Sequence, residues 1–213
     1  MNPTLASHAW WLASRASGLI ALALITISVG LGLALSGRVT KRPGLPRMMN
    51  AIHEQTAVTA LVAIAVHGLT LLADPWLNPG LAGISIPFTM AYKPLWTGLG
   101  IVGGYMAAIL GLSFYIRRRI GPKLWRKAHR FMIVVYGLAV AHTIGAGTDA
   151  STPWLRVWLY VTTPVIATLF VARLVSSIRL GRKPAAAERL PHHRPAPEPR
   201  LVRPQPQFSE DPA

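Results

Sequence analysis

The sequence has no cysteine, and only 14% of its 213 residues are charged. Without cysteine the chain cannot form disulfides, thiolate metal sites, iron–sulfur clusters or c-type haem attachments, and it cannot carry out thiol redox chemistry. Soluble domains contain about 25% charged residues. Because 52% of the residues here are hydrophobic, the composition argues against a soluble enzyme and predicts an integral membrane protein.

Acidic residues are also scarce, with 7 Asp and Glu against 22 Lys and Arg and a formal net charge of +15. Such a balance would suggest a nucleic-acid-binding protein if the bases formed one patch with aromatic side chains between them. The bases lie instead between long apolar runs. We therefore expect no nucleic-acid partner. We interpret the basic residues as determinants of membrane orientation that can also contact lipid phosphates.

Long apolar runs dominate the first five-sixths of the chain. A bilayer core needs roughly 20 apolar residues at about 1.5 Å each. Five runs are long enough, at approximately residues 11–35, 51–73, 95–116, 124–146 and 154–178. The predicted fold class is an all-α integral membrane bundle of about five transmembrane helices, occupying residues 1–183. The Pro- and Arg-rich residues 184–213 predict a disordered cytoplasmic tail.

The basic residues predict the direction of these spans. Of the Lys and Arg residues, all but Arg15, Lys93 and Arg156 lie after the first, third or fifth apolar run, or close to the end of that run. The segments that follow these three runs lie on one side of the bilayer, and the positive-inside rule predicts that this side is cytoplasmic. The N-terminus is then outside and the C-terminus cytoplasmic, as an odd number of spans requires. We expect a multi-pass protein of the cell membrane, in contact with membrane lipid.

Three glycines of the third run, Gly98, Gly100 and Gly103, spell G-x-G-x-x-G. A dinucleotide-binding turn with this pattern needs a preceding strand and an acidic residue about 20 positions later. Here the glycines lie inside an apolar span, and residues 117–119 are arginines. The better interpretation is that small residues let neighbouring helices approach closely.

Four histidines lie inside the predicted spans. His53 and His67 are fourteen residues apart in the second span, and His129 and His142 are thirteen apart in the fourth. Ionisable side chains within a bilayer are costly and are functional candidates by default. Both spans are predicted to run from inside to outside. His53 and His129 then share an inner level, and His67 and His142 share an outer level roughly 20 Å away.

Two imidazoles from facing helices at one depth can occupy both axial positions of a haem iron. The two pairs would stack two haems across the membrane, the inner one on His53 and His129 and the outer one on His67 and His142. With both axial positions filled, no site is open to a substrate, and the predicted chemistry is electron transfer. A single membrane histidine is as readily explained by a hydrogen bond to another helix, but two matched pairs favour ligation.

The unequal spacings pose a geometric problem. Fourteen residues at about 100° each return to within about 40° of the starting face of a helix, whereas thirteen miss it by about 140°. An ideal fourth helix therefore cannot aim His129 and His142 at the same partner. Two solutions remain open: local tightening of the helix near Gly137, or an irregular first turn after Pro122 that carries His129.

Residues 53–68 and 125–143, which carry the four histidines, resemble the ferric reductase-like transmembrane domain family. That family includes NADPH oxidases, ferric reductases and the membrane haem subunit of bacterial methionine sulfoxide reductase systems. The resemblance covers roughly residues 48–173, and the family's spacings of fourteen and thirteen match. It implies an oxidoreductase subunit whose two b-type haems carry electrons from a cytoplasmic donor to an acceptor outside.

The chain departs from the family pattern in two ways. The family core commonly has six spans with histidines on the third and fifth, whereas here they lie on the second and fourth. The larger oxidases also carry a flavin and nicotinamide domain, and nothing after Ile178 could fold into one. We therefore expect the donor to be a separate cytoplasmic reductase, a free reduced flavin or a quinol.

Haem propionates are anionic and favour cationic partners. Arg15, near the outer end of the first span, either pairs with the outer haem or extends outward to the interface. Arg130 and two neighbouring bases flank His129 and can hold inner propionates. Asp149 lies just outside the fourth span, where it can cap the helix or face an acceptor.

Two other functions remain open at this point. One is a quinol-linked cytochrome b anchor for a soluble redox partner, which would use the same ligands with a different donor. The other is a non-haem polytopic assembly or transport protein whose histidines form a proton path.

Overall fold

The computed structural model describes residues 3–37 and 42–181, and this part of the chain is helical with no strand. The predicted all-α membrane fold is confirmed. The predicted tail, residues 184–213, lies outside the described residues. In chain order the elements are α1 (Pro3–Ser36), α2 (Leu45–Leu72), α3 (Gly80–Ser85), α4 (Pro94–Leu112), α5 (Arg117–Ile120), α6 (Pro122–His129), α7 (Met132–Ala146) and α8 (Pro153–Gly181).

Five helical segments are long and apolar enough to cross a membrane: His8–Ser36, Leu45–Leu72, Pro94–Leu112, Pro122–Ala146 and Pro153–Ile178. Most of their ends lie within a few residues of the sequence-based boundaries. The largest difference is at the second span, which begins six residues earlier than expected. An apolar run predicts only the part of a helix that crosses the hydrocarbon core. The helix α2 begins before that part, with Pro46 in its first turn and polar residues between Pro46 and the apolar run.

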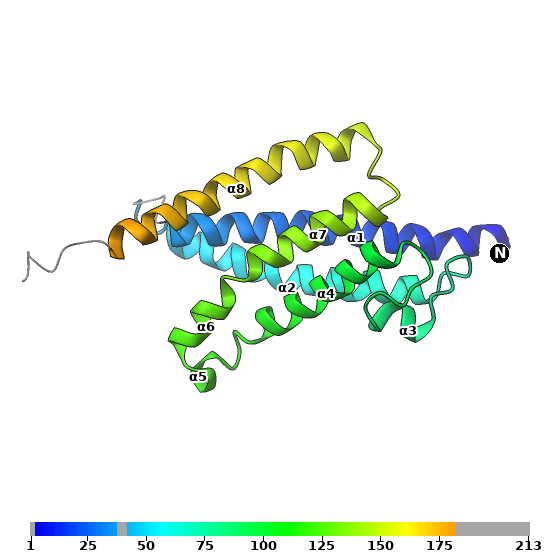
Figure 1. Ribbon diagram of the computed structural model, residues 1–213, viewed down its shortest axis with the longest axis horizontal. Helices are drawn as coiled ribbons and strands as arrows, with labels where there is room; N and C mark the ends of the chain where they lie inside the picture. Colours follow the sequence, from blue (N-terminus) through cyan, green and yellow to red (C-terminus); the bar gives the residue numbers. More distant parts are fainter. Residues whose placement is uncertain (1–2, 38–41, 182–213) are drawn as a thin grey trace, which may run out of the picture.

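Two pairs of helices contribute to the site, and each pair contains one helix that carries histidine. The helix α2, with His53 and His67, packs mainly along α1, and α7, with His142, packs mainly along α4. One apolar core cluster joins the pairs through Ile25 of α1, Ala60 of α2, Tyr136 of α7 and Ile166 of α8. We therefore call α1 the backing helix of α2, and α4 the backing helix of α7 (Figure 1).

The long connection from α2 to α4 lies against the bundle. Within it α3 packs against α2, and the hydroxyl of Tyr105 in α4 donates to the carbonyl of Ser85 at 2.6 Å. The ammonium group of Lys93 donates to the carbonyl of Gly145 at 2.8 Å, near the end of α7, where a cation also complements the helix dipole. This connection thereby fixes the end of the bundle near His142.

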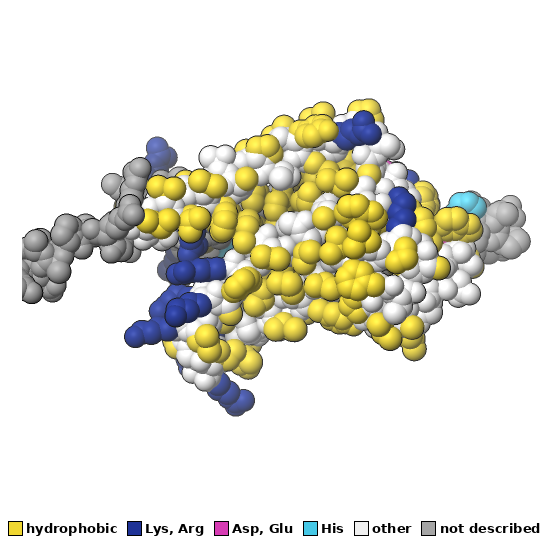
Figure 2. All heavy atoms as spheres, in the orientation of Figure 1, with side chains coloured by type: hydrophobic (Ala, Val, Ile, Leu, Met, Phe, Trp, Pro, Cys, Tyr) yellow, Lys and Arg dark blue, Asp and Glu magenta, His cyan; other side chains and the backbone are white. Residues whose placement is uncertain are grey.

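The surface divides into an apolar flank and a basic end. Hydrophobic side chains cover the flank of the bundle in Figure 2, whereas Lys and Arg side chains gather mainly at the end formed by α5 and α6. Figure 1 shows that α8 ends at the opposite end of the bundle from the start of α1. This arrangement fits the expected positive-inside topology, although which end faces the cytoplasm stays a prediction.

Candidate metal centre

The four membrane histidines meet in the two pairs expected from their depths. The imidazoles of His53 and His129 have ring centroids 6.2 Å apart with planes at 90°. Those of His67 and His142 are also 6.2 Å apart, with planes at 75°. We call the first pair the His53 level and the second the His67 level. Fourteen residues of α2 separate the two levels, or about 21 Å at the usual helical rise.

The spacing of the rings discriminates between two kinds of histidine pair. A metal–imidazole nitrogen bond is about 2.0–2.1 Å, and the centroid of an imidazole lies about 1.15 Å behind its nitrogen for ring bonds near 1.35 Å. Two imidazoles on opposite sides of one metal then have centroids about 6.3 Å apart. A direct N–H···N hydrogen bond of about 2.9 Å would bring them to about 5.2 Å. The observed 6.2 Å at both levels is too long for a direct hydrogen bond and close to the metal-bridged value. Ordinary edge-to-face ring contacts span about 4.5–7 Å, so the spacing permits a metal between the rings but does not require one.

Backbone carbonyls of the backing helices determine which ring nitrogen is free in three of the four histidines. A carbonyl oxygen only accepts hydrogen bonds, so each contacting Nδ1 must carry the proton, which leaves the lone pair on Nε2. Metal-bound histidines commonly donate their other N–H in this way. The contacts are His53 Nδ1 to Ser28 O at 2.8 Å, His67 Nδ1 to Ser14 O at 2.8 Å, and His142 Nδ1 to Trp96 O at 2.9 Å.

The fourth histidine, His129, is held by an aromatic stack instead. Its Nδ1 is buried and makes no hydrogen bond of good geometry among the described residues, and the carbonyl of Leu110 lies near the ring. The indole of Trp125 stacks on its ring, with centroids 4.9 Å apart and planes at 26°, and Phe114 packs on Trp125 at 5.9 Å. Buried N–H groups without a partner are rare, so His129 is the least constrained member of the set.

A break in the fourth span resolves the thirteen-residue spacing. Residues Arg130 and Phe131 separate α6 from α7, and their amides bond to carbonyls three residues back rather than four, at 3.3 and 3.0 Å. Such 3₁₀-type bonds tighten the turn, and α6 bends away from the axis of α7 (Figure 1). His129 is the last residue of α6. The irregularity therefore lies directly after His129. Both sequence-based locations are wrong, because Gly137 lies inside α7 and the turn after Pro122 belongs to the helix α6, which ends at His129.

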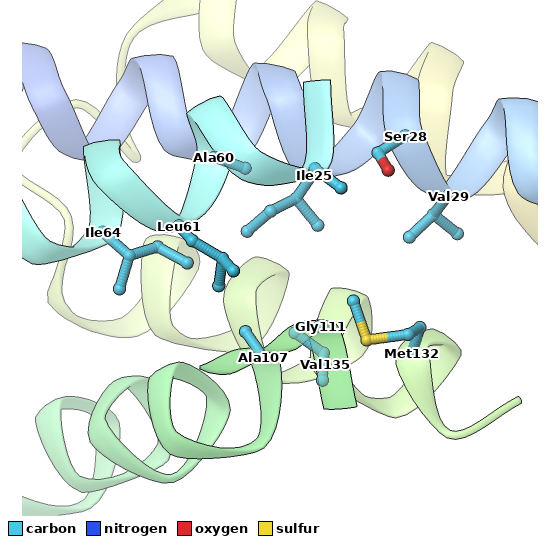
Figure 3. Close-up of a pocket in the computed structure, with 11 residues that line it drawn as sticks. Ile25, Ser28, Val29, Ala60, Leu61, Ile64, Ala107, Gly111, Met132 and Val135 are labelled. Atoms are coloured by element: carbon cyan, nitrogen blue, oxygen red, sulfur yellow. The ribbon is translucent and has the colours of Figure 1, made fainter. Parts of the chain in front are cut away.

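An apolar pocket lies between the two levels, where α1, α2, α4 and α7 converge (Figure 3). The cavity itself is small, about 30 Å³. Its one polar side chain is Ser28, which also contacts His53. The lining residues are Ile25, Ser28, Val29, Ala57, Ala60, Leu61, Ile64, Ala107, Gly111, Met132 and Val135. Apolar walls around so small a cavity keep the region between the imidazole pairs nearly free of water.

The ligand count at each level suits haem. Among residues 3–37 and 42–181, no group of three or more His, Asp or Glu side chains gathers around one point. Each level supplies two imidazoles. Two is the number of axial positions on a haem iron, whose other four ligands belong to the macrocycle.

Arg15 is engaged by a partner that the sequence did not reveal. Its Nε donates to Asp149 Oδ2 at 2.6 Å, and a second N–H of the guanidinium bonds the other carboxylate oxygen. Asp149 is only 3% exposed, whereas Arg15 is 36% exposed and lies over the ring of Trp11. The ion pair ties α1 to the connection between α7 and α8. A contact of Arg15 with a propionate stays a prediction, and so does that of the exposed Arg130.

Sequence reasoning missed the residues that surround the imidazoles on the backing helices. On α1 a serine is followed four positions later by a glycine, twice, and the two copies are fourteen residues apart, like His53 and His67. That repeat was a signal available in the sequence. The residues whose contacts with the imidazoles were missed are Ser14, Gly18, Ser28, Gly32, Trp96 and Gly100.

The model of one known family, described as the ferric reductase like transmembrane component, matches residues 17–140. The matched region contains His53, His67 and His129, and His142 lies two residues beyond it. The comparisons with curated proteins and with solved structures returned no significant match.

Proposed function

Since this chain belongs to the ferric reductase like transmembrane component family, we propose that it transfers electrons across the membrane through two b-type haems. His53 and His129 bind the inner haem, and His67 and His142 bind the outer one. The carrying observation is the equal 6.2 Å spacing of the imidazoles at both levels. When bound, haem supplies one-electron chemistry at iron.

The chain itself provides binding, orientation and exclusion of water. Two histidines would hold each haem, so the site would relay electrons rather than bind a substrate at the metal. The backing-helix carbonyls accept from Nδ1 of three of the histidines and leave Nε2 as the nitrogen that could bind a metal. Apolar side chains between the levels keep water out of the space that electrons cross, and the helical rise places the levels about 21 Å apart.

Basic side chains near each level suit the propionates of a haem. An arginine presents five N–H donors, and Arg15 uses two of them on Asp149, so the others are available to the outer propionates. At the inner level Arg130 follows His129 directly and is exposed. These two arginines are the propionate partners in our proposal.

Electrons enter at the basic end formed by α5 and α6, which faces the cytoplasm in this proposal. A positive surface attracts anionic donors and raises their encounter rate. A separate reductase with an acidic docking face or a free reduced flavin phosphate suits this end. The acceptor lies outside the membrane, beyond the His67 level, and the protein is a subunit of the cell membrane.

The test is the reduced-minus-oxidised spectrum of the purified full chain, with haem counted per polypeptide. We expect a low-spin b-type signal and two haems. His67→Ala should retain one haem, and Gly68→Ala is a suitable control because a methyl group there would contact nothing within 4 Å. A folded but colourless wild-type protein would overturn the proposal.

One feature favours the quinol-linked alternative. An open apolar groove runs between α1 and α8, beside the bundle core, and its wall includes Gly30 of α1 and Val161 of α8. A groove open to the bilayer can take the isoprenoid chain of a quinol. Rapid reduction of the haems by a short-chain quinol, blocked by Gly30→Trp, would favour this donor. Reduction by flavin alone would exclude it.

A further inference from the structure

Three of the four histidines rest in the same backbone arrangement. Each Nδ1 meets the carbonyl of a residue on the backing helix, and the residue four positions further on is a glycine that leaves room for the ring. A Cβ atom on Gly18 would lie 3.0 Å from His67 Nδ1, and one on Gly32 would lie 3.2 Å from His53 Cε1. On Gly100 it would lie 2.5 Å from Nδ1 of His142. We call each carbonyl with its glycine a cradle.

The two cradles on α1 add a serine hydroxyl. Ser14 Oγ lies 3.2 Å from His67 Nδ1 and donates to the backbone carbonyl of His67 at 3.3 Å. Ser28 Oγ repeats this at His53, with distances of 3.1 and 3.4 Å. The proton on Nδ1 is therefore shared between a carbonyl and a hydroxyl of the same serine. The hydroxyl in turn links the imidazole to its own main chain.

His129 has an incomplete cradle. The carbonyl of Leu110, fourteen residues after Trp96 on α4, lies near the His129 ring, but His129 Nδ1 makes no hydrogen bond of good geometry among the described residues. The residue four positions after Leu110 is Phe114 rather than glycine. The His67 level thus has two well-formed Nδ1 hydrogen bonds, and the His53 level has one.

We propose that Ser14, Ser28 and Gly100 are positioning residues, whose cradles orient His67, His53 and His142 and set the reduction potentials of the two haems. This inference rests on the proposed haem ligation. A hydrogen bond from Nδ1 raises the basicity of the ligand nitrogen, and a more basic ligand favours ferric over ferrous iron. Each serine serves one level, so each hydroxyl affects one haem.

The first test is redox titration of the haem-loaded full chain, which should show two one-electron waves. Ser14→Ala should raise the potential of one wave and Ser28→Ala that of the other. If a variant weakens the preference for the ferric state tenfold, the reduction potential of that haem rises by about 59 mV for a one-electron couple. Thr26→Val is the matched control, because within residues 3–37 and 42–181 the buried Thr26 hydroxyl bonds only to the carbonyl of Leu22 in its own helix.

The second test compares two glycines one turn apart on α4. Gly100→Ala forces His142 to move, so one haem should lose its low-spin spectrum or dissociate. Gly104→Ala places a methyl group 3.6 Å from Ile64 Cγ2, an ordinary contact, and should leave the spectrum unchanged. Both substitutions add the same helix propensity, so a difference between them reports the contact with His142.

The outcomes separate this inference from the proposed function. If the wild-type chain folds without haem, the proposed function fails, and the inference fails with it. If the wild type holds two haems, but neither serine variant moves a wave and Gly100→Ala keeps both low-spin signals, only the cradles are refuted. If Gly100→Ala does not assemble, the serine titrations decide alone. A shift of both waves by one serine variant would also contradict the inference that each serine affects one haem.

Discussion

The ion pair between Arg15 and Asp149 allows a quantitative prediction about how the bundle is held together. It joins residues 134 positions apart through two hydrogen bonds. Removing one member of a buried pair costs about 3–5 kcal/mol, whereas exposed pairs contribute about 0.2–1 kcal/mol. Asp149 is buried but Arg15 is 36% exposed, and solvent screening reduces the full buried value. We expect a coupling energy of about 1–3 kcal/mol.

A double-mutant cycle with Arg15→Met, Asp149→Asn and the double variant measures this coupling. Unfolding in mixed micelles by a denaturing detergent, followed by far-ultraviolet circular dichroism, supplies the free energies. Arg156→Met combined with Asp149→Asn is the control cycle, because Arg156 Nε bonds the neutral carbonyl of Ala150. The control coupling should be close to zero.

Two results would refute this reasoning. A coupling within about 0.3 kcal/mol of zero would show that the pair does not stabilise the fold. A complete loss of the outer haem in Asp149→Asn would show that the carboxylate acts on the cofactor site rather than on helix packing. We expect the opposite, because Asp149→Asn frees the guanidinium for the propionates and leaves both imidazole pairs intact.

Three further predictions concern the histidines, the basic end and the glycines. His53→Ala should lose one haem of two, since each level has its own ligands; haem-to-protein ratios check this, and loss of neither haem would contradict it. Reduction by an anionic flavin should slow as salt rises toward 0.15 M, where the Debye length is about 8 Å; stopped-flow rates that ignore salt would argue against entry at the basic end. Gly137→Ala should stabilise α7 by roughly 0.5–1 kcal/mol, because the added methyl group would contact nothing within 4 Å. Gly98→Ala should destabilise the fold, because its Cβ would lie 2.2 Å from Phe88 Cδ1. Unfolding in mixed micelles distinguishes the two glycine variants.

Hydropathy and helical rise were sufficient to predict the spans and the pairing of the histidines. Both depend on distances along one axis, which the sequence states directly at about 1.5 Å per residue. His53 and His129 therefore fell at one depth without any knowledge of how the helices are arranged. The direction in which a side chain points around the helix axis is harder to predict, because each local irregularity between two residues changes the angle between their side chains. The break after His129 changes that rotation, and no residue type at Arg130 or Phe131 indicates it.

Contacts between distant segments were beyond sequence reasoning for a physical reason. An isolated Arg15 in the first span and an isolated Asp149 outside the fourth are compatible with several partners at the same depth. Only the packing of α1 against the α7–α8 connection selects one of them. The cradles are similar, because a carbonyl acceptor is present at every residue. The glycines Gly18 and Gly32 become informative only when their spacing is compared with that of the histidines.

The division of the ligands between two helix pairs gives haem a structural role as well as an electronic one. At each level one imidazole comes from the α1–α2 pair, and the other comes from the α4, α6 and α7 side. Each haem would therefore link the two halves of the bundle from within. A cofactor that binds only the folded state stabilises it by about 2.7 kcal/mol at one hundred times its dissociation constant. Two such links would lie on either side of the apolar pocket along the helix axes, and each would add to the stability of the folded bundle.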